Sequence, residues 1–395
     1  MKTKRILMLS LLIIFASCKK EELHFDSDYN LVEATKTSLK VQGHMYFPEP
    51  TPIAEIGLCW SEVSNPTVSD NHYSTTGSWE LSHYCLTHTL EGLKPETAYH
   101  VRVYAVNGSE YLYGDDICVK TMANGLFTVD QNRWVRFAKG NLQYQASTNT
   151  WRFAEHQWDY IGYSEPDQHG FVYGTVEGSS NHLVGPDYDG WIDLFGWGTS
   201  GHDHGAVCYQ PWSTSENDAN YYAYGSAHYN LYEWEGQADW GSNPIVNGGN
   251  QPNLWRTLSF KEWEYLLQNR KTASGIRYAA ASVNGLLGTV ILPDDWDDTI
   301  YPLNTAPFEI NSISLDDWYL LEENGAVFLP PTGCRTGKSV SDGYQYGGYW
   351  SSSKITSFGT PQDWAAWNFR TSYGNIYFEE SHRHYGLSVR LVQDY

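Results

Sequence analysis

The sequence has few cysteines, few basic residues and no long apolar run among its 395 residues. Its six cysteines are irregularly spaced and include no paired C-x-x-C, which argues against a zinc ribbon and against a disulfide framework. Lys and Arg number 25 against 46 Asp and Glu, and the formal net charge is −21 at pH 7. Because such a surface repels phosphate, we expect no nucleic acid partner. The apolar runs are too short to cross a bilayer as helices.

The first 18 residues have the order of a secretion signal, MKTKRILMLSLLIIFASC: a basic start, a short apolar core, and small residues before a cysteine. This order resembles the lipobox of bacterial lipoproteins more than an ordinary signal with an incidental cysteine. The resemblance implies a signal peptide over 1–17 and a lipid on Cys18 that attaches the chain to a membrane. The segment 18–27 then begins with KKEE after the cysteine, which is either a solvated linker or similar to a surface-sorting tag. We expect a lipid-anchored protein of the bacterial outer membrane, exposed at the cell surface.

Residues 28–122 alternate between apolar and polar positions in short runs separated by turn residues. In LEGLKPETAYHVRVYAVN (90–107), Tyr99, Val101 and Val103 share one strand face. The spacing of Leu93, Pro95, Thr97 and Tyr99 predicts a tyrosine corner, in which the phenol bonds back to the chain. This segment resembles the fibronectin type III-like domains of bacterial surface lipoproteins, which implies an all-β sandwich without chemistry of its own. Cys59 and Cys118 neighbour apolar-face positions, so we expect both to point outward and stay free.

The composition changes after Phe127, where 15 of the 17 tryptophans lie. Residues 258–270, LSFKEWEYLLQNR, are the strongest helix pattern, because Ser259 and Glu262 form a capping box. Strands are predicted at 288–292, at 327–329 and near the C-terminus. The pattern indicates one loop-rich, helix-poor domain over 123–395.

Four segments of this part carry a family resemblance: WRTLSFKEWEYLL (255–267), GAVFLPPTGCRTG (325–337), GGYWSSS (347–353) and GLSVRLV (386–392). They resemble the C-type-lectin-like fold, in the branch of the formylglycine-generating enzymes and the "major paralogous" surface domains. The resemblance implies an α+β domain in which 347–353 is a core strand, with Trp350 buried and the serines bonded to nearby backbone. It makes a nucleophilic serine at 351–353 the weaker interpretation.

The formylglycine-generating enzymes use a cysteine pair to bind copper, and this sequence departs from them there. The second domain has only Cys208 and Cys334, far apart in the chain. Since copper(I) needs soft thiolates held together, the resemblance implies the fold without the oxidase activity. We expect no enzyme and no cofactor.

Two polar segments could still hold a metal ion. His202 and His204 in GHDHG would share a strand face and could bind zinc or copper, but no third ligand is evident and a polar loop is the stronger interpretation. Asp187 and Asp189 in PDYDGWID could hold a structural calcium ion, or could lie in a solvated turn.

The segment 208–236 is rich in aromatic residues without clear periodicity, so we expect a long ordered loop. Its rings could bind sugar faces or protein partners, and about half of them could fill the core instead. The ligand-binding candidates are Trp212, Tyr221, Tyr222, Tyr224 and Trp234. The sequence therefore predicts a non-catalytic, lipid-anchored surface protein that binds a glycan or a protein. The alternatives are a metal-dependent enzyme on the same fold and a structural subunit of a surface assembly.

Overall fold

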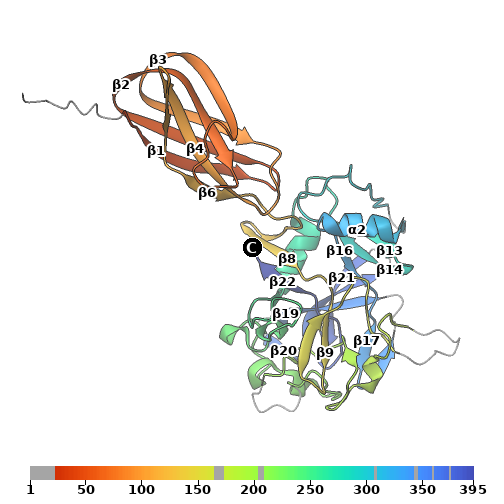
Figure 1. The fold of residues 1–395 in the computed structure, drawn as a ribbon. Helices are drawn as coiled ribbons and strands as arrows, with labels where there is room; N and C mark the ends of the chain where they lie inside the picture. Colours follow the sequence, from red (N-terminus) through yellow and green to blue (C-terminus); the bar gives the residue numbers. More distant parts are fainter. Residues whose placement is uncertain are drawn as a thin grey trace, which may run out of the picture. The chain divides into compact units, whose positions relative to one another are not determined.

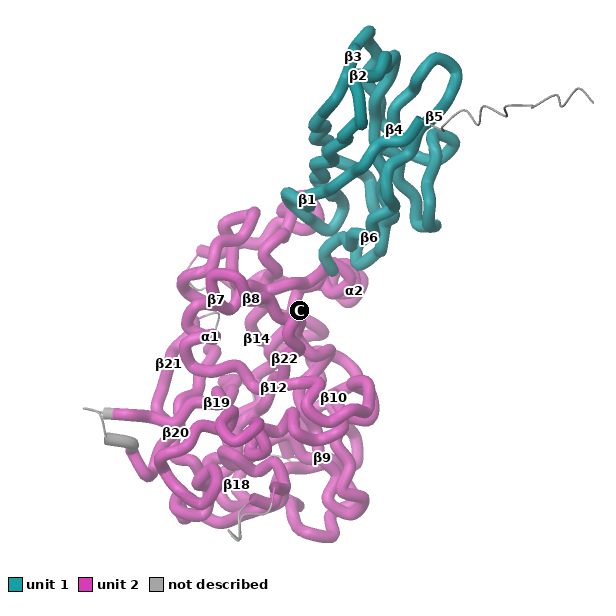
Figure 2. The backbone as a smooth tube through the Cα atoms, turned by 90° about the vertical axis from the view of Figure 1, so that its left-hand side faces the viewer, with its two compact units in different colours: residues 1–123 teal, residues 124–395 magenta. Residues whose placement is uncertain are grey.

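The computed structural model describes residues 23–163, 173–202, 209–306, 309–341, 346–357, 360–372 and 375–395. The chain divides into two compact units, Met1–Ala123 and Asn124–Tyr395 (Figure 2). Both units consist mainly of antiparallel strands (Figure 1). Within the described ranges there are two α-helices, and no helix is long and apolar enough to span a bilayer. The chain is therefore multidomain, β-rich and helix-poor, as the sequence predicted.

The first unit is an all-β sandwich. Its strands are β1 (Asp26–Ala34), β2 (Leu39–Ser61), β3 (Asn71–Leu90), β4 (Ala98–Asn107), β5 (Glu110–Tyr113) and β6 (Ile117–Lys120). The long strand β2 changes partner: its first half pairs with β1, its second half pairs with β4, and β3 follows it along both halves. The register with β3 shifts between Tyr46 and Thr51, where Pro48 and Pro50 have no amide to donate. This change of partner encloses an apolar core that includes Leu39, Val41, Leu58, Val101 and Val103.

The predicted tyrosine corner is confirmed at the start of β4. The Tyr99 hydroxyl accepts a hydrogen bond from the Lys94 amide at 3.0 Å, and the Tyr99 ring is 5% exposed. The phenol therefore closes the turn before β4 from within the sandwich, as the spacing of residues 93–99 predicted.

The outward orientation expected for Cys59 is wrong, whereas Cys118 is exposed as expected. Cys59 is fully buried in a small second cluster with Tyr104, and Val68 and Tyr113 pack against this cluster. The second face of β2 and β4 is therefore covered here, which the alternation of β2 alone does not reveal. Burial raises the pKa of the Cys59 thiol to about 12, so this cysteine is not a reactive thiolate.

The described residues of the second unit form five small sheets. The first joins β12 (Arg256–Thr257), β22 (Leu391–Asp394), β8 (Arg133–Phe137) and β7 (Phe127–Asp130), so the two ends of the unit pair with each other. The second joins β10 (Thr150–Phe153), β9 (Leu142–Gln145) and β11 (Trp191–Ile192). The others are β15 (Asn311–Ile313), β13 (Tyr278–Val283), β14 (Leu286–Ile291) and β16 (Val327–Leu329); β17 (Cys334–Thr336) with β18 (Ser339–Ser341); and β19 (Gly347–Ser357), β20 (Thr360–Ser372) and β21 (Asn375–His382).

Helices are short in this unit. The predicted helix is α1 (Phe260–Glu264), and both bonds of the Ser259–Glu262 capping box are present. It continues into the π-helical turn η6 (Tyr265–Asn269), and Trp263, Leu266 and Leu267 are buried. The second helix is α2 (Leu315–Glu323), which the sequence analysis missed. The described part of the unit also contains five short 3-10 turns: η1 (Asn181–Leu183), η2 (Asp218–Tyr221), η3 (Ala223–Gly225), η4 (Trp234–Gly236) and η5 (Trp240–Ser242).

The segment 347–353 is part of strand β19, as predicted. The hydroxyls of Ser351 and Ser353 bind backbone, as expected, whereas the Ser352 hydroxyl is buried without a hydrogen-bond partner among the described residues. Trp350 is fully buried and its indole donates to the Phe195 carbonyl at 2.7 Å. The Ser351 hydroxyl donates to the Trp367 carbonyl at 2.7 Å, and the Ser353 hydroxyl accepts from the Phe260 amide at 3.1 Å. The Ser351 and Ser353 hydroxyls therefore join neighbouring segments of the fold.

Fully buried arginines fasten the loops of this unit to one another. Arg335 donates to the carbonyls of Leu194, Ser213 and Gly337, and it has 1% of its surface exposed. Arg270, Arg383 and Arg390 are equally buried and also donate to backbone carbonyls. A loop-rich fold leaves many carbonyls without a strand partner, and a guanidinium can satisfy several of them at once.

Candidate functional site

The aromatic loop divides into rings that support the core and rings that reach the surface. Tyr221 is 2% exposed, and its hydroxyl donates to the Ser215 carbonyl at 2.7 Å. Trp212 is partly buried against the main tryptophan-rich core. Tyr222 is partly buried, and the Arg383 guanidinium lies 5.1 Å from its ring centre. These three candidates therefore lie against or within the packed interior, where they contribute to the scaffold.

Trp234 is different, because 62% of its surface is exposed. Its indole stacks on Tyr224, with ring centres 5.9 Å apart and planes inclined by 27°. Tyr229 meets the same indole edge-on, with ring centres 5.7 Å apart. Among the described tryptophans, Trp234 alone is largely exposed. We call the three rings of Trp234, Tyr224 and Tyr229 the ring platform.

The ring platform is held rigidly from below. The Tyr224 hydroxyl donates to the Glu233 carbonyl and accepts from the Ala238 amide, the latter at 3.1 Å. Burial is the main cause that raises the pKa of Tyr224, so the phenol stays neutral and keeps its proton for the bond to Glu233. An exposed indole on a fixed support loses little entropy when a ligand binds to it.

The backbone of the ring platform is strained. Tyr224, Trp234 and Glu235 have φ values of 52°, 50° and 63°. These values lie in the left-handed region, which residues other than glycine rarely adopt. Each such residue costs about 1–2 kcal/mol. Strain of this kind persists only where the surrounding structure enforces it, and it concentrates at functional sites.

A polar cavity of about 310 Å³ adjoins the ring platform through Glu235. Its lining side chains offer hydroxyl, carboxamide, imidazole and carboxylate groups: Ser200, His202, Glu235, Gln237, Ser242, Asn243 and Asn253. Several of them are fixed; the Asn243 amide, for example, donates to the Ser200 carbonyl at 2.8 Å. His202 meets Tyr224 edge-on with ring centres 6.2 Å apart, so the cavity and the platform share a wall. An apolar ring face beside convergent polar groups is an arrangement that can bind a small hydroxylated ligand.

A larger cavity of about 620 Å³ lies elsewhere, at the start of α1. Four of its charged residues are already paired with each other. Arg256 binds Glu262 at 2.9 Å and Asp394 at 2.7 Å, and Arg133 binds Glu262 at 3.0 Å. The salt bridges join the termini of the unit to α1, so we interpret this cavity as part of the scaffold.

The structure describes three of the four metal candidates from the sequence. His202 lines the polar cavity, whereas His204 lies outside the described residues. Asp187 and Asp189 are exposed, and within the described part of the chain they join no group of three candidate ligands. The Asp193 carboxylate nearby is fully buried between the Asn181 amide (2.8 Å) and the Ile161 amide (2.9 Å), which makes it a structural group.

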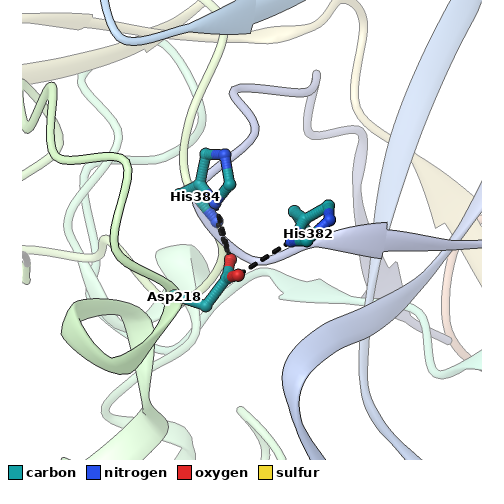
Figure 3. Close-up of side chains that lie close together, drawn as sticks. All are labelled: Asp218, His382 and His384. Atoms are coloured by element: carbon teal, nitrogen blue, oxygen red, sulfur yellow. Dashed lines mark hydrogen bonds and ion pairs between the residues drawn. The ribbon is translucent and has the colours of Figure 1, made fainter.

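The fold brings together one cluster that the sequence did not predict, which consists of Asp218, His382 and His384 (Figure 3). A local signal was present, because His382 and His384 repeat the His-x-His spacing that was noted at 202–204. Asp218 lies 164 residues before His382 and carries no local pattern, so the triad becomes visible only in the fold.

No protein family and no curated protein matches this chain. Among solved structures, the sensor domain of the anti-sigma factor RsgI4 of Pseudobacteroides cellulosolvens matches 25% of this chain and 95% of its own, with 22% identity and a TM-score of 0.20. The chicken CNTN1 FN1-FN3 domains match 25% of this chain and 31% of their own, with 20% identity and a TM-score of 0.18. A human fibronectin type III domain from the KIAA0970 protein matches 25% of this chain and 74% of its own, with 13% identity and a TM-score of 0.16. At this level of similarity, they indicate nothing about ligand or activity.

Proposed function

We propose that the second unit is a non-catalytic, C-type-lectin-like domain that binds a neutral carbohydrate at the ring platform and its polar cavity. The observation that carries the proposal is the exposed Trp234 indole on a fixed tyrosine support beside a polar cavity. Sugars present C–H faces that pack on aromatic rings and hydroxyls that bind amides and carboxylates. The cavity volume is at the low end of the range of about 300–1,000 Å³ for small-molecule sites.

The charge of the chain favours an uncharged glycan. The formal net charge is −21 at pH 7, and Glu233 and Glu235 flank the indole. The negative charge of the protein would repel an acidic polysaccharide, whereas it would not repel a neutral one. In the whole chain, the lipid on Cys18 would hold the protein at the outer membrane of a bacterium, and the sandwich would serve as the spacer that carries the binding unit.

The test is a binding titration with neutral and acidic polysaccharides on the wild-type chain and on Trp234→Ala. Removing the indole should weaken binding of the neutral ligand at least about ten-fold, since a central aromatic contact typically contributes more than about 1.4 kcal/mol. Gln237→Ala should weaken binding as well, through the cavity. Tyr377→Ala is the matched control, because its ring is 48% exposed on β21 and belongs to neither the platform nor the cavity.

The thermal melts of all variants are compared with the wild type, so that a loss of binding is separated from a loss of fold. A folded wild-type chain that binds no neutral polysaccharide contradicts the proposal. Binding that survives Trp234→Ala unchanged contradicts the location of the site, and binding of acidic polymers only contradicts the charge argument.

A further inference from the structure

Asp218, His382 and His384 bring three metal-ligand groups together from two distant segments. Asp218 begins η2 inside the aromatic loop, His382 ends β21, and His384 follows two residues later. The Nδ1 atom of His382 lies 2.8 Å from one Asp218 carboxylate oxygen, and the Nδ1 atom of His384 lies 2.7 Å from the other. Figure 3 shows both imidazoles turned toward the carboxylate, and one ligand atom from each residue lies within 4.8 Å of the other two.

We propose that this triad binds one divalent transition-metal ion, with zinc the first candidate. Two imidazoles and one carboxylate are a donor set typical of zinc, copper, nickel and cobalt, whereas calcium and magnesium prefer oxygen alone. The donor atoms are near enough for small side-chain rotations to bring all three to metal bond lengths of about 2.0–2.2 Å. Three protein ligands leave a fourth position for water or for a ligand atom.

The surroundings of the triad suit an ion that enters from solvent and is then partly shielded. The His382 side chain is 43% exposed, while those of Asp218 and His384 are 17% and 10% exposed. Trp364 and Tyr385 pack beside His382, with ring centres 5.0 and 5.2 Å away. A partly apolar shell of this kind strengthens the interaction between a cation and its ligands.

The neighbouring charges have to permit a cation. Arg383 stands between the two histidines in sequence, but its guanidinium turns into the core, where it donates to the carbonyls of Ala365 and Gln362 and lies 4.7 Å from the Trp197 ring centre. Asp218 and Asp363 both interact electrostatically with Arg383. The two carboxylates outnumber the one guanidinium, so the local charge is negative and favours a cation.

A bound ion would join η2 to the end of β21. The aromatic loop would then be held at Asp218, ahead of the residues that form the ring platform. The metal site does not depend on the proposed carbohydrate function, since its ligands lie outside both the platform and the polar cavity. The competing explanation is a metal-free clamp, in which the carboxylate accepts hydrogen bonds from both imidazoles.

The test is a Co²⁺ titration of the whole chain, followed by visible absorption, with Zn²⁺ as competitor. We expect one equivalent of Co²⁺ to give a d–d spectrum that Zn²⁺ removes. His382→Ala and Asp218→Asn should each weaken binding by more than about 100-fold, because loss of a direct ligand exceeds the ~10–100-fold effect of an outer-shell group. His156→Ala is the matched control, because His156 pairs with Asp159 at 3.2 Å and this pair belongs to no described group of three candidate ligands.

The melting temperature gives the second readout. Zn²⁺ should raise the melting temperatures of the wild type and of His156→Ala, and it should leave the melting temperature of His382→Ala unchanged. His382 is exposed enough for its variant to fold, which near-ultraviolet circular dichroism checks. The metal proposal is overturned if Co²⁺ gives no saturable spectrum, or if the spectrum survives both His382→Ala and Asp218→Asn. The metal-free clamp is then the role of the triad.

Discussion

Arg390 offers a direct test of how this loop-rich unit is held together. Its side chain is 1% exposed, and its three nitrogens reach three separate acceptors. They donate to the Asn141 side chain at 3.0 Å, to the Ala138 carbonyl at 3.1 Å and to the Phe328 carbonyl at 2.7 Å. The guanidinium thus connects the segment after β8 with β16, and Arg390→Met removes it while keeping an aliphatic stem of similar length.

The expected magnitude comes from two opposing effects. The substitution leaves three buried acceptors without a donor, and each costs about 1–3 kcal/mol, or about 3–9 kcal/mol together. Against this, the buried charge is itself costly. Burial lowers the pKa of Arg390 to about 10, a shift that corresponds to about 3 kcal/mol. We therefore expect Arg390→Met to lower the free energy of unfolding by about 3 kcal/mol.

Urea unfolding of the whole chain measures this change in the transition that belongs to the second unit. The control is Arg370→Met, because Arg370 is 39% exposed and pairs with Glu379 at 3.4 Å on the surface. Exposed pairs contribute about 0–1 kcal/mol, so this variant should resemble the wild type. Buried charged groups in some proteins can be replaced by apolar residues without loss. If Arg390→Met is as stable as Arg370→Met, the orphaned carbonyls are not costly here and the reasoning fails.

Three further predictions concern pH, domain structure and anchoring. Burial raises the pKa of Asp193 to about 6, so the folded state binds this proton more tightly than the unfolded state. The free energy of unfolding should therefore fall as pH rises between about pH 4 and pH 6. Urea midpoints measured across this pH range should show the fall in the wild type, and Asp193→Asn should lack the part that Asp193 contributes. A fragment of residues 124–395 should unfold cooperatively in a thermal melt, since the contacts divide the chain there; an unfolded fragment would contradict the boundary. Cys18→Ala should release the protein from the membrane fraction or leave its signal uncleaved, and unchanged fractionation would contradict a lipid anchor.

Local features of the fold could be predicted because their signals lie within a few residues. The Ser259–Glu262 capping box sets the start of α1, and the spacing before Tyr99 sets the corner of the sandwich. Each depends on hydrogen bonds between residues at most five positions apart. The buried strand around Trp350 followed from a family resemblance, which carries long-range information that alternation alone lacks.

The orientation of single side chains could not be predicted in the same way. Cys59 is buried because Val68 and Tyr113 pack against its cluster, and neither is adjacent to it in the sequence. Trp212 and Trp234 lie in the same loop, yet the first packs on the core and the second is exposed. The 3-10 turns of this loop have no periodicity, so sequence alone gives no face to assign to either ring.

Only part of the candidate site could be predicted, because its residues come from segments that are far apart in the sequence. Tyr224 and Trp234 were identified from composition, and the structure brings them together on one platform. The polar cavity beside them collects residues from 200 to 253, which no motif joins. The triad of Asp218 with His382 and His384 spans 164 residues or more, and only the packing of η2 against the end of β21 creates it.

The buried arginines and the strained platform are connected by one physical requirement. A loop can hold Trp234 in a left-handed conformation only if the rest of the loop cannot relax, since each such residue costs about 1–2 kcal/mol. In this unit Arg383 donates to the Ala227 carbonyl at 3.2 Å, and Asp218 binds His384, so the aromatic loop is tied to the core at two points. The loop therefore behaves as part of the scaffold, and the carbohydrate that we propose for the indole would meet a surface that is already ordered. If the proposal is right, loosening either tie should reduce carbohydrate affinity even though neither tie belongs to the platform.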